Sequence, residues 1–242
     1  MTAWQLLGLG AVILLGAGTQ RVTGLGFALV AAPFVVLLIG PFDGVLLVNA
    51  CGMITAMLVL PQVWRQVDLR RAGLLLGPAL LAVVPGAWVA RQVAAPVLAI
   101  IIGGMLLVAL VAVLTSEKAR LLQGAGGAVI AGAGSGFMSV TAGVGGPAIT
   151  VYALSTRWPH QAFAATAQLI FAAMGAASVT AKGGMPALAP AVWAVVAAAL
   201  GVGVLVGNRL AGRVSAHRAM KAVVLLALSG AAITIIKGVI QL

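Results

Sequence analysis

Two glycine-rich breaks interrupt the apolar stretches of this chain at corresponding points of its two halves. The first covers residues 21–27 (RVTGLGF) and the second residues 141–147 (TAGVGGP). Backbone groups cannot stay unpaired in lipid, so a helix interrupted at membrane depth must be buried in protein or face a water-filled cavity. Paired breaks of this kind mark substrate sites in transporters with repeated halves. We therefore expect the functional site at these breaks.

Composition places the chain in the all-α polytopic membrane class. Of its 242 residues, 63% are hydrophobic and 7% are charged, with a mean hydropathy of +1.21. Soluble domains carry about 25% charged residues, and barrel strands alternate polar with apolar residues, unlike residues 98–114. The net charge of +11 fits Lys and Arg in cytoplasmic loops. No nucleic-acid partner is expected.

Segment lengths indicate two broken helical hairpins. Ten apolar segments are expected, at 3–18, 24–40, 44–60, 72–90, 96–115, 121–139, 146–156, 161–181, 187–207 and 219–240. A spanning helix needs about 20 residues, and the 146–156 segment would cover only about half of a roughly 30 Å hydrocarbon core. We interpret 3–40 and 121–157 as re-entrant or broken hairpins, each followed by three transmembrane helices.

The distribution of basic residues tests the hairpins. If each hairpin leaves on the side it entered, Arg91, Lys182 and Lys237 lie outside and ten others lie inside: Arg65, Arg70, Arg71, Lys118, Arg120, Arg157, Arg209, Arg213, Arg218 and Lys221. Single crossings would divide the same residues six against seven, with no bias to orient the protein. Ten complete spans would give the same loop sides as the hairpins. Both termini are then extracytoplasmic, and a bacterial inner membrane is the expected location.

The two halves are predicted to be inverted-topology repeats within one transmembrane domain, repeat 1 at about 1–120 and repeat 2 at about 121–242. A shift of 119 residues aligns 24–26 (GLG) with 143–145 (GVG) and pairs Asn49 with Gln168, the only amides well inside their expected segments. Chance alignment of two glycine-rich halves is the alternative. Inverted repeats are a transporter architecture.

Helices that begin at the breaks would direct free N–H groups and about half a positive charge at a ligand, which predicts an anion. Glycines let the ligand approach the backbone, and the two threonines could donate hydroxyl groups. Close helix packing without a ligand is the alternative. The residues expected to bind substrate at the breaks are Thr23, Gly24, Gly26, Thr141, Gly143, Gly145 and Gly146.

Three further side chains are candidates. Arg21 is the basic residue at the first break, and its planar fork of donors would suit an oxyanion; alternatively it snorkels to the interface. Asn49 and Gln168 would supply neutral donors if the halves pack face to face, or would form an interhelical hydrogen bond without a ligand. Ser135 and Ser139 are weaker candidates.

Several chemistries are excluded by what the expected spans lack. The acids Asp43, Asp68 and Glu117 and the histidines fall in expected loops. No carboxylate is then available as a sodium ligand or proton relay, and we expect no metal. No enzyme motif is present, Cys51 has no basic neighbour to activate it, and neither catalysis nor a cofactor is expected.

The chain resembles the TauE/SafE sulfite exporter family. The resemblance rests on the repeated halves, on the tips followed by Pro33 and Pro147, and on the stretch 134–138 (GSGFM) that leads into 143–147 (GVGGP). Phe27 and Ala28 stand where that family would typically carry a longer glycine run. The resemblance implies a transporter, probable in the export direction, of sulfite or an organosulfonate, and implies binding at the matching glycines 24, 26, 143, 145 and 146.

The sequence thus predicts an integral membrane transporter whose partners are the lipid bilayer and a small anion such as sulfite, sulfoacetate or thiosulfate, bound near midplane between the two tips. Transport of another small anion and a membrane accessory role without transport are the alternatives. The anion, the direction and the oligomer stay open.

Overall fold

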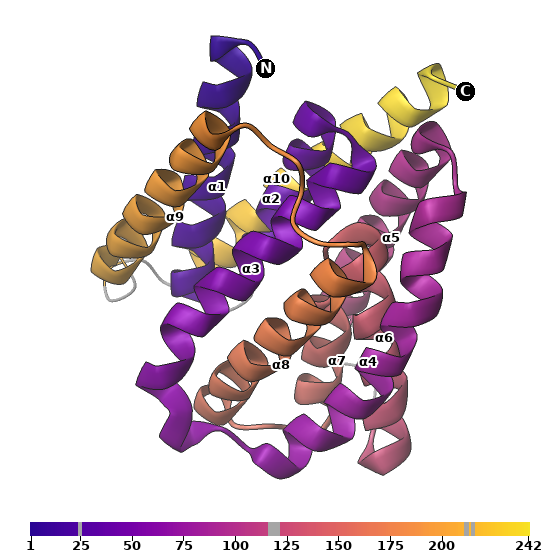
Figure 1. Cartoon of the computed structure of the whole chain (residues 1–242). Helices are drawn as coiled ribbons and strands as arrows, with labels where there is room; N and C mark the ends of the chain where they lie inside the picture. The colour runs from indigo at the N-terminus through magenta and orange to yellow at the C-terminus, as the bar shows by residue number, and fades with distance from the viewer. Residues whose placement is uncertain (24–25, 116–121, 211–212, 214–215) are drawn as a thin grey trace.

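The chain folds into a bundle of helices in the computed structural model, which describes residues 1–23, 26–115, 122–210, 213 and 216–242 (Figure 1). The all-α prediction is confirmed, since the described residues contain no strand. The helices are α1 (Ala3–Thr23), α2 (Gly26–Ile39), α3 (Pro41–Val63), the 3-10 turn η1 (Trp64–Gln66), α4 (Leu69–Gln92), α5 (Ala95–Thr115), α6 (Gly124–Ala142), α7 (Gly146–Ser155), α8 (His160–Ala181), α9 (Pro190–Leu210) and α10 (Ala216–Ile240).

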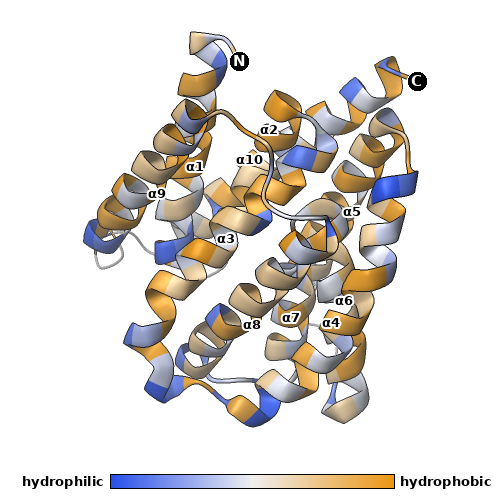
Figure 2. Ribbon diagram, viewed as in Figure 1, coloured by the Kyte–Doolittle hydropathy of each residue, from blue (hydrophilic) through white to orange (hydrophobic). Residues whose placement is uncertain are grey.

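Eight helices in the described part of the chain are long and apolar enough to cross a membrane. The exceptions are α2, with 14 residues, and α7, with 10. Each broken segment therefore pairs one long helix with one short helix. Hydrophilic stretches lie mainly toward the two ends of the bundle, and apolar stretches lie between them (Figure 2).

Helix α1 runs to Thr23, beyond the end predicted at residue 18. Its polar residues do not stop it, because the hydroxyl of Thr19 donates to the Leu15 carbonyl at 2.8 Å and that of Thr23 to the Thr19 carbonyl at 2.8 Å. Helix α6 likewise extends through Thr141, beyond the predicted end at 139. It stops at Gly143, whose positive φ of 73° is a conformation that favours glycine.

Glycines set the spacing of the helix pairs. Cβ atoms at Gly132 and Gly136 of α6 would lie 2.3 and 2.0 Å from the α4 carbonyls of Leu75 and Ala79. A Cβ atom at Gly203 of α9 would lie 2.6 Å from the Leu14 carbonyl oxygen of α1. These glycines, four residues apart on α6, allow backbones to touch, which is the small-residue packing expected in membranes.

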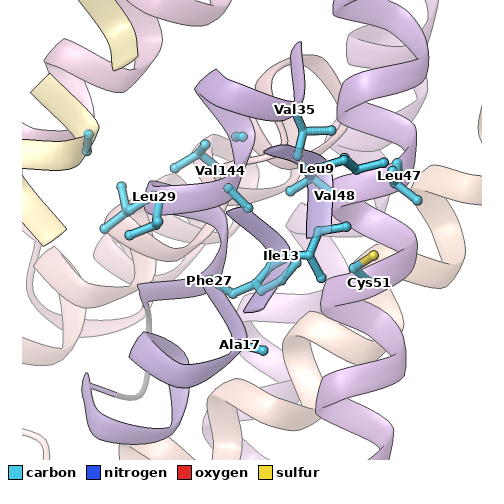
Figure 3. Close-up of a cluster of buried hydrophobic side chains, with 14 of the residues drawn as sticks. Leu9, Ile13, Ala17, Phe27, Leu29, Val35, Leu47, Val48, Cys51 and Val144 are labelled. Carbon is cyan, nitrogen blue, oxygen red and sulfur yellow. The ribbon is translucent and has the colours of Figure 1, made fainter. Parts of the chain in front are cut away.

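The largest apolar core joins α1, α2, α3, α5, α9 and α10 with the connection between α6 and α7. Figure 3 shows Ile13 and Ala17 of α1, Phe27 and Leu29 of α2 and Val144 from that connection among its members. The first hairpin is therefore packed against the tip of the second. Helix α3 also packs along α8, and α5 along α10.

Both termini lie at the same end of the bundle (Figure 1). At this end Arg91 donates to the Ala181 carbonyl at 2.7 Å and Lys237 to the Leu37 carbonyl at 2.9 Å, so both cap helix carbonyls. The Lys182 ammonium lies over the ring of Phe42 at 4.6 Å. The predicted minority of basic residues thus occupies one end and stabilises neighbouring helices there.

Lys182 gives a testable pH dependence. It is 6% exposed, and burial lowers the pKa of its ammonium to about 7, while Asp43 raises it and Arg91 lowers it further. The unfolded chain keeps this proton up to about pH 10.4, so from pH 7 to pH 9 the unfolded state binds more protons and stability rises with pH. We expect the melting temperature in detergent to rise over that range and the rise to shrink in Lys182→Met. An equal rise in the variant would contradict this assignment.

The glycine seam gives a matched pair of variants. Gly136→Ala should lower the free energy of unfolding by about 1–3 kcal/mol, because overpacking against a carbonyl forces the backbones apart. Gly134 lies on the same helix, and a Cβ there would meet Ala148 at an ordinary 3.7 Å. Gly134→Ala should leave the melting temperature unchanged or raised. Equal effects of the two variants would show that the seam does not set the spacing.

Candidate substrate cavity

A cavity of about 40 Å³ lies where the start of α2, the middle of α3 and the connection from α6 to α7 meet. One water needs about 10–15 Å³ of such space, so this cavity has room for a few waters or a small ion. We call it the central cavity. Its lining residues are Gln20, Phe27, Ala28, Leu29, Val48, Asn49, Gly52, Met53, Ser139, Gly143, Val144, Gly145, Gly146, Pro147 and Phe171.

The second glycine-rich tip forms one wall of the central cavity. The Gly143 and Val144 N–H groups return to carbonyls at the end of α6, at 2.9 and 3.3 Å, and close that helix. Helix α7 starts at Gly146 with Pro147 in its first turn, and Gly145 at its N-cap offers no side-chain hydrogen bond. The first N–H groups of α7 have no intrahelical partner, so they are free for a ligand in the cavity.

Packing also explains part of this tip. A Cβ at Gly145 would lie 2.8 Å from the Ser135 carbonyl oxygen, and the Ser135 hydroxyl donates to the Gly145 carbonyl at 2.7 Å. Ser135 therefore fixes the tip and does not line the cavity. Thr141 is also turned away, because its hydroxyl donates to the Phe137 carbonyl and contacts the Met105 sulfur at 3.3 Å.

The first tip contributes its following helix. Helix α2 begins at Gly26, and the side chains of Phe27 and Ala28 border the cavity. Gly24 lies outside the described residues. Thr23 is buried and donates to its own helix, and it does not line the cavity. The second tip thus borders the cavity with backbone, and the start of α2 borders it with the Phe27 ring.

Asn49 and Ser139 form a reciprocal pair at the cavity. The Asn49 amide donates to the Ser139 carbonyl at 2.8 Å, and the Ser139 hydroxyl donates to the Asn49 side-chain oxygen at 3.0 Å. Both residues are buried. One N–H of the Asn49 amide is left over from this pair, so it can still reach a ligand.

Gln168 and Arg21 lie in a different cavity. This second cavity, of about 210 Å³, lies between the end of α1, the second half of α3 and the start of α8. Its polar lining residues are Gln20, Arg21, Gln66, His160, Gln161 and Gln168, and we call it the basic vestibule. The Arg21 guanidinium donates to the side-chain oxygen of Asn208 on α9. Gln66, His160 and Gln161 are exposed, so the vestibule reaches the surface at the end opposite the termini.

The expected site residues are thus divided between two places. Asn49, Gly143, Gly145 and Gly146 line the central cavity. Gln168 and Arg21 line the basic vestibule, and Thr23 and Thr141 line neither. The structure does not bring all these side chains to one cavity, because the hydroxyls of Thr23 and Thr141 bond to their own helices and Arg21 bonds to Asn208.

Gln20 is the residue that the sequence reasoning missed. It lines both cavities, and its amide donates to the Gln168 side-chain oxygen at 3.5 Å. Ending the first segment at residue 18 placed Gln20 outside it. The alignment of the two halves by 119 residues could have indicated Gln20, because it pairs Gln20 with Ser139 as it pairs Asn49 with Gln168.

The chemistry of the central cavity is that of neutral donors. None of its lining residues carries a charge. Arg21, which follows the lining residue Gln20 in the sequence, lies in the vestibule. Among the described residues no group of three or more His, Cys, Asp or Glu could hold a metal ion. Amide and backbone N–H groups in an apolar surround favour binding of a small anion.

Comparison with known proteins supplies the family. No match is found among curated proteins or solved structures. The model of one family, described as Sulfite exporter TauE/SafE, matches residues 9–235 and so spans both tips and both cavities. This is a family of membrane transporters, in agreement with the eight long apolar helices. The chain belongs to the TauE/SafE sulfite exporter family.

Proposed function

We propose that this protein exports a small sulfur oxyanion, sulfite or an organosulfonate, and binds it in the central cavity. The observation that carries the proposal is the start of α7, which meets a cavity lined by amides and bare backbone with no acid. A sulfur oxyanion presents acceptor oxygens at its charged end, and this cavity presents donors.

The energetics favour an anion over a cation at this place. Bringing a charge out of water costs several kcal/mol unless the protein replaces the lost hydration. The start of α7 supplies free N–H groups and about half a positive charge, and Asn49 adds an amide donor on the opposite wall. No described residue at the cavity offers the carboxylate that sodium or a proton would need.

The architecture we propose is a pair of inverted repeats, 1–120 and 121–242, in which α1 to α5 correspond to α6 to α10. Matching helix pairs support it. Helix α6 packs on α4 as α1 packs on α9, while α3 packs on its own counterpart α8 and α5 on α10. Each half runs from a hairpin through three further helices, so the second half enters from the opposite side.

The charge distribution supports an orientation with both termini extracytoplasmic in a bacterial inner membrane. The termini share their end of the bundle with Arg91, Lys182 and Lys237. Turn η1 with Arg65 and the connection from α7 to α8 with Arg157 lie toward the other end (Figure 1). Basic residues concentrate on the cytoplasmic side, so the basic vestibule faces the cytoplasm. Arg21 would then attract anions to the inner mouth.

Anion binding should be visible as thermal stabilisation. A ligand that binds only the folded state at 100 times its dissociation constant adds about 2.7 kcal/mol, so sulfite or sulfoacetate should raise the melting temperature of the detergent-solubilised protein. Absence of a shift with sulfite, sulfoacetate, thiosulfate and sulfate would favour an accessory protein without transport.

Asn49→Asp should remove this stabilisation. The replacement nearly keeps the shape of the side chain but places a negative charge at the cavity. Repulsion of about 4 kcal/mol at 4 Å and an effective dielectric of 20 predicts an affinity loss of about a hundredfold or more. Gln62→Glu, on the exposed part of the same helix, is the matched control and should bind normally. An unchanged affinity in Asn49→Asp would remove Asn49 from the site.

The absence of acids at the cavity predicts electrogenic export. An inside-negative potential assists outward movement of an anion by about 2.3 kcal/mol per charge per 100 mV, so no coupling ion is required. In proteoliposomes, an imposed potential that is negative on the cytoplasmic side should accelerate sulfite efflux. Flux that ignores both the size and the sign of the potential would contradict uncoupled export.

A further inference from the structure

The central cavity and the basic vestibule are neighbours, and Gln20 is the one residue that the structure places in the lining of both. Gln20 comes from α1, and Gln168 faces it from α8. Both side chains are buried, with exposures of 6% and 5%. The two carboxamides therefore stand between the proposed anion site and a cavity that reaches the surface.

This carboxamide pair is weakly held. Its hydrogen bond is 3.5 Å long, at the outer limit for such bonds. The Oε1 atom of Gln20 is buried and has no hydrogen-bond partner in the described structure. Buried polar atoms are nearly always paired, so an unpaired amide oxygen at the junction of two cavities points to water at this place, because the oxygen accepts hydrogen bonds and a sulfur oxyanion has none to donate.

The pair has a counterpart on the other side of the cavity. The 119-residue shift takes Asn49 to Gln168 and Gln20 to Ser139. The Asn49–Ser139 contact is therefore related to the Gln168–Gln20 contact by the same exchange of halves. The counterpart is held by two hydrogen bonds of 2.8 and 3.0 Å, so one pair is closed firmly and the other loosely.

The helices beside the two pairs also pack unequally, more tightly beside one pair than beside the other. Helix α4 packs along α8, but its counterpart α9 touches α3 at only a few positions. Both helices pack on the first helix of a hairpin, α4 on α6 and α9 on α1. Figure 1 shows α1 and α9 together at one side of the bundle. The vestibule lies beside this looser side, between α1, α3 and α8.

We propose that these two pairs are alternating gates on either side of the anion site, and that the Gln20–Gln168 pair separates the site from a basic vestibule that receives the oxyanion first. In this structure the Asn49–Ser139 gate is shut and the Gln20–Gln168 gate is nearly open. This inference rests on the proposed function. Amides suit the gate because their N–H groups can pass to the oxygens of the anion as the pair separates.

A gate changes rates, whereas a binding residue changes affinity. Gln20→Leu and Gln168→Leu should slow sulfite flux in proteoliposomes at least tenfold, because a leucine side chain cannot donate a hydrogen bond to the anion. The sulfite affinity measured by thermal shift should fall by a smaller factor than the flux, and by no more than about threefold in Gln168→Leu, because Gln168 does not line the central cavity. Gln62→Leu is the matched control, because Gln62 donates to its own helix at Leu58 and lines neither cavity. Flux within twofold of native, or an affinity that falls by as much as the flux, would overturn the gate.

A second experiment does not depend on the substrate. Cys51 is buried, so Cys51→Ser gives a background for single cysteines at Gly52, where a Cβ meets nothing within 4 Å, and at Ala164 in the vestibule. A charged methanethiosulfonate reagent should label Ala164→Cys rapidly with or without Gln20→Ala. It should label Gly52→Cys slowly, and at least tenfold faster when Gln20→Ala is added.

The two experiments separate the two proposals. If Gly52→Cys is labelled at the same rate with and without Gln20→Ala, the gate is overturned, even if the protein transports sulfite. If Gln20→Ala accelerates the labelling of Gly52→Cys but the native protein neither binds nor transports sulfite, the gate is retained and the proposed substrate is rejected.

Discussion

The structure depends on how the backbone is satisfied at the second tip, in the middle of an apolar bundle. The end of α6 is closed by its own carbonyls through Gly143 and Val144, and the Gly145 carbonyl is taken by Ser135. Two carbonyls at the end of α6 and the Gly145 carbonyl are thus paired within the protein. The donors at the start of α7 receive no side-chain cap. Uncapped donors at a helix start have the polarity that an anion requires.

The glycine seams hold that tip in place. Gly136 brings α6 against the α4 backbone, and Gly175 of α8 brings that helix against the carbonyl of Asn49 at the cavity. Bulky side chains at these positions would separate the helices that carry the amides. Glycine thus allows close packing at Gly136 and places bare backbone at the central cavity at Gly146. Of the two alternatives that the sequence raised, packing applies at Gly136, and binding at Gly146 stays a proposal.

The sequence was sufficient for the helices and insufficient for the directions of side chains. Apolar runs and glycine breaks located the ten α-helices of the described residues, because burial in lipid leaves helices as the available structure. Helices α1 and α6 carry polar side chains on more than one side, so no single polar stripe indicated which way Arg21 or Thr141 faces. Gln20 was missed because hydroxyl groups bonded to their own helix let α1 continue beyond residue 18. The unequal packing of α4 and α9 could not be read from halves that align with each other.

The position of a bound oxyanion tests the central claim most directly. Selenite has the shape of sulfite and scatters anomalously at the selenium edge, so a structure of the native protein with selenite locates the ion. We predict one anomalous peak in the central cavity, about 3 Å from the first backbone nitrogen atoms of α7 and beside the Asn49 amide. A peak confined to the surface, or no peak in the cavity at selenite concentrations that raise the melting temperature, would contradict the account.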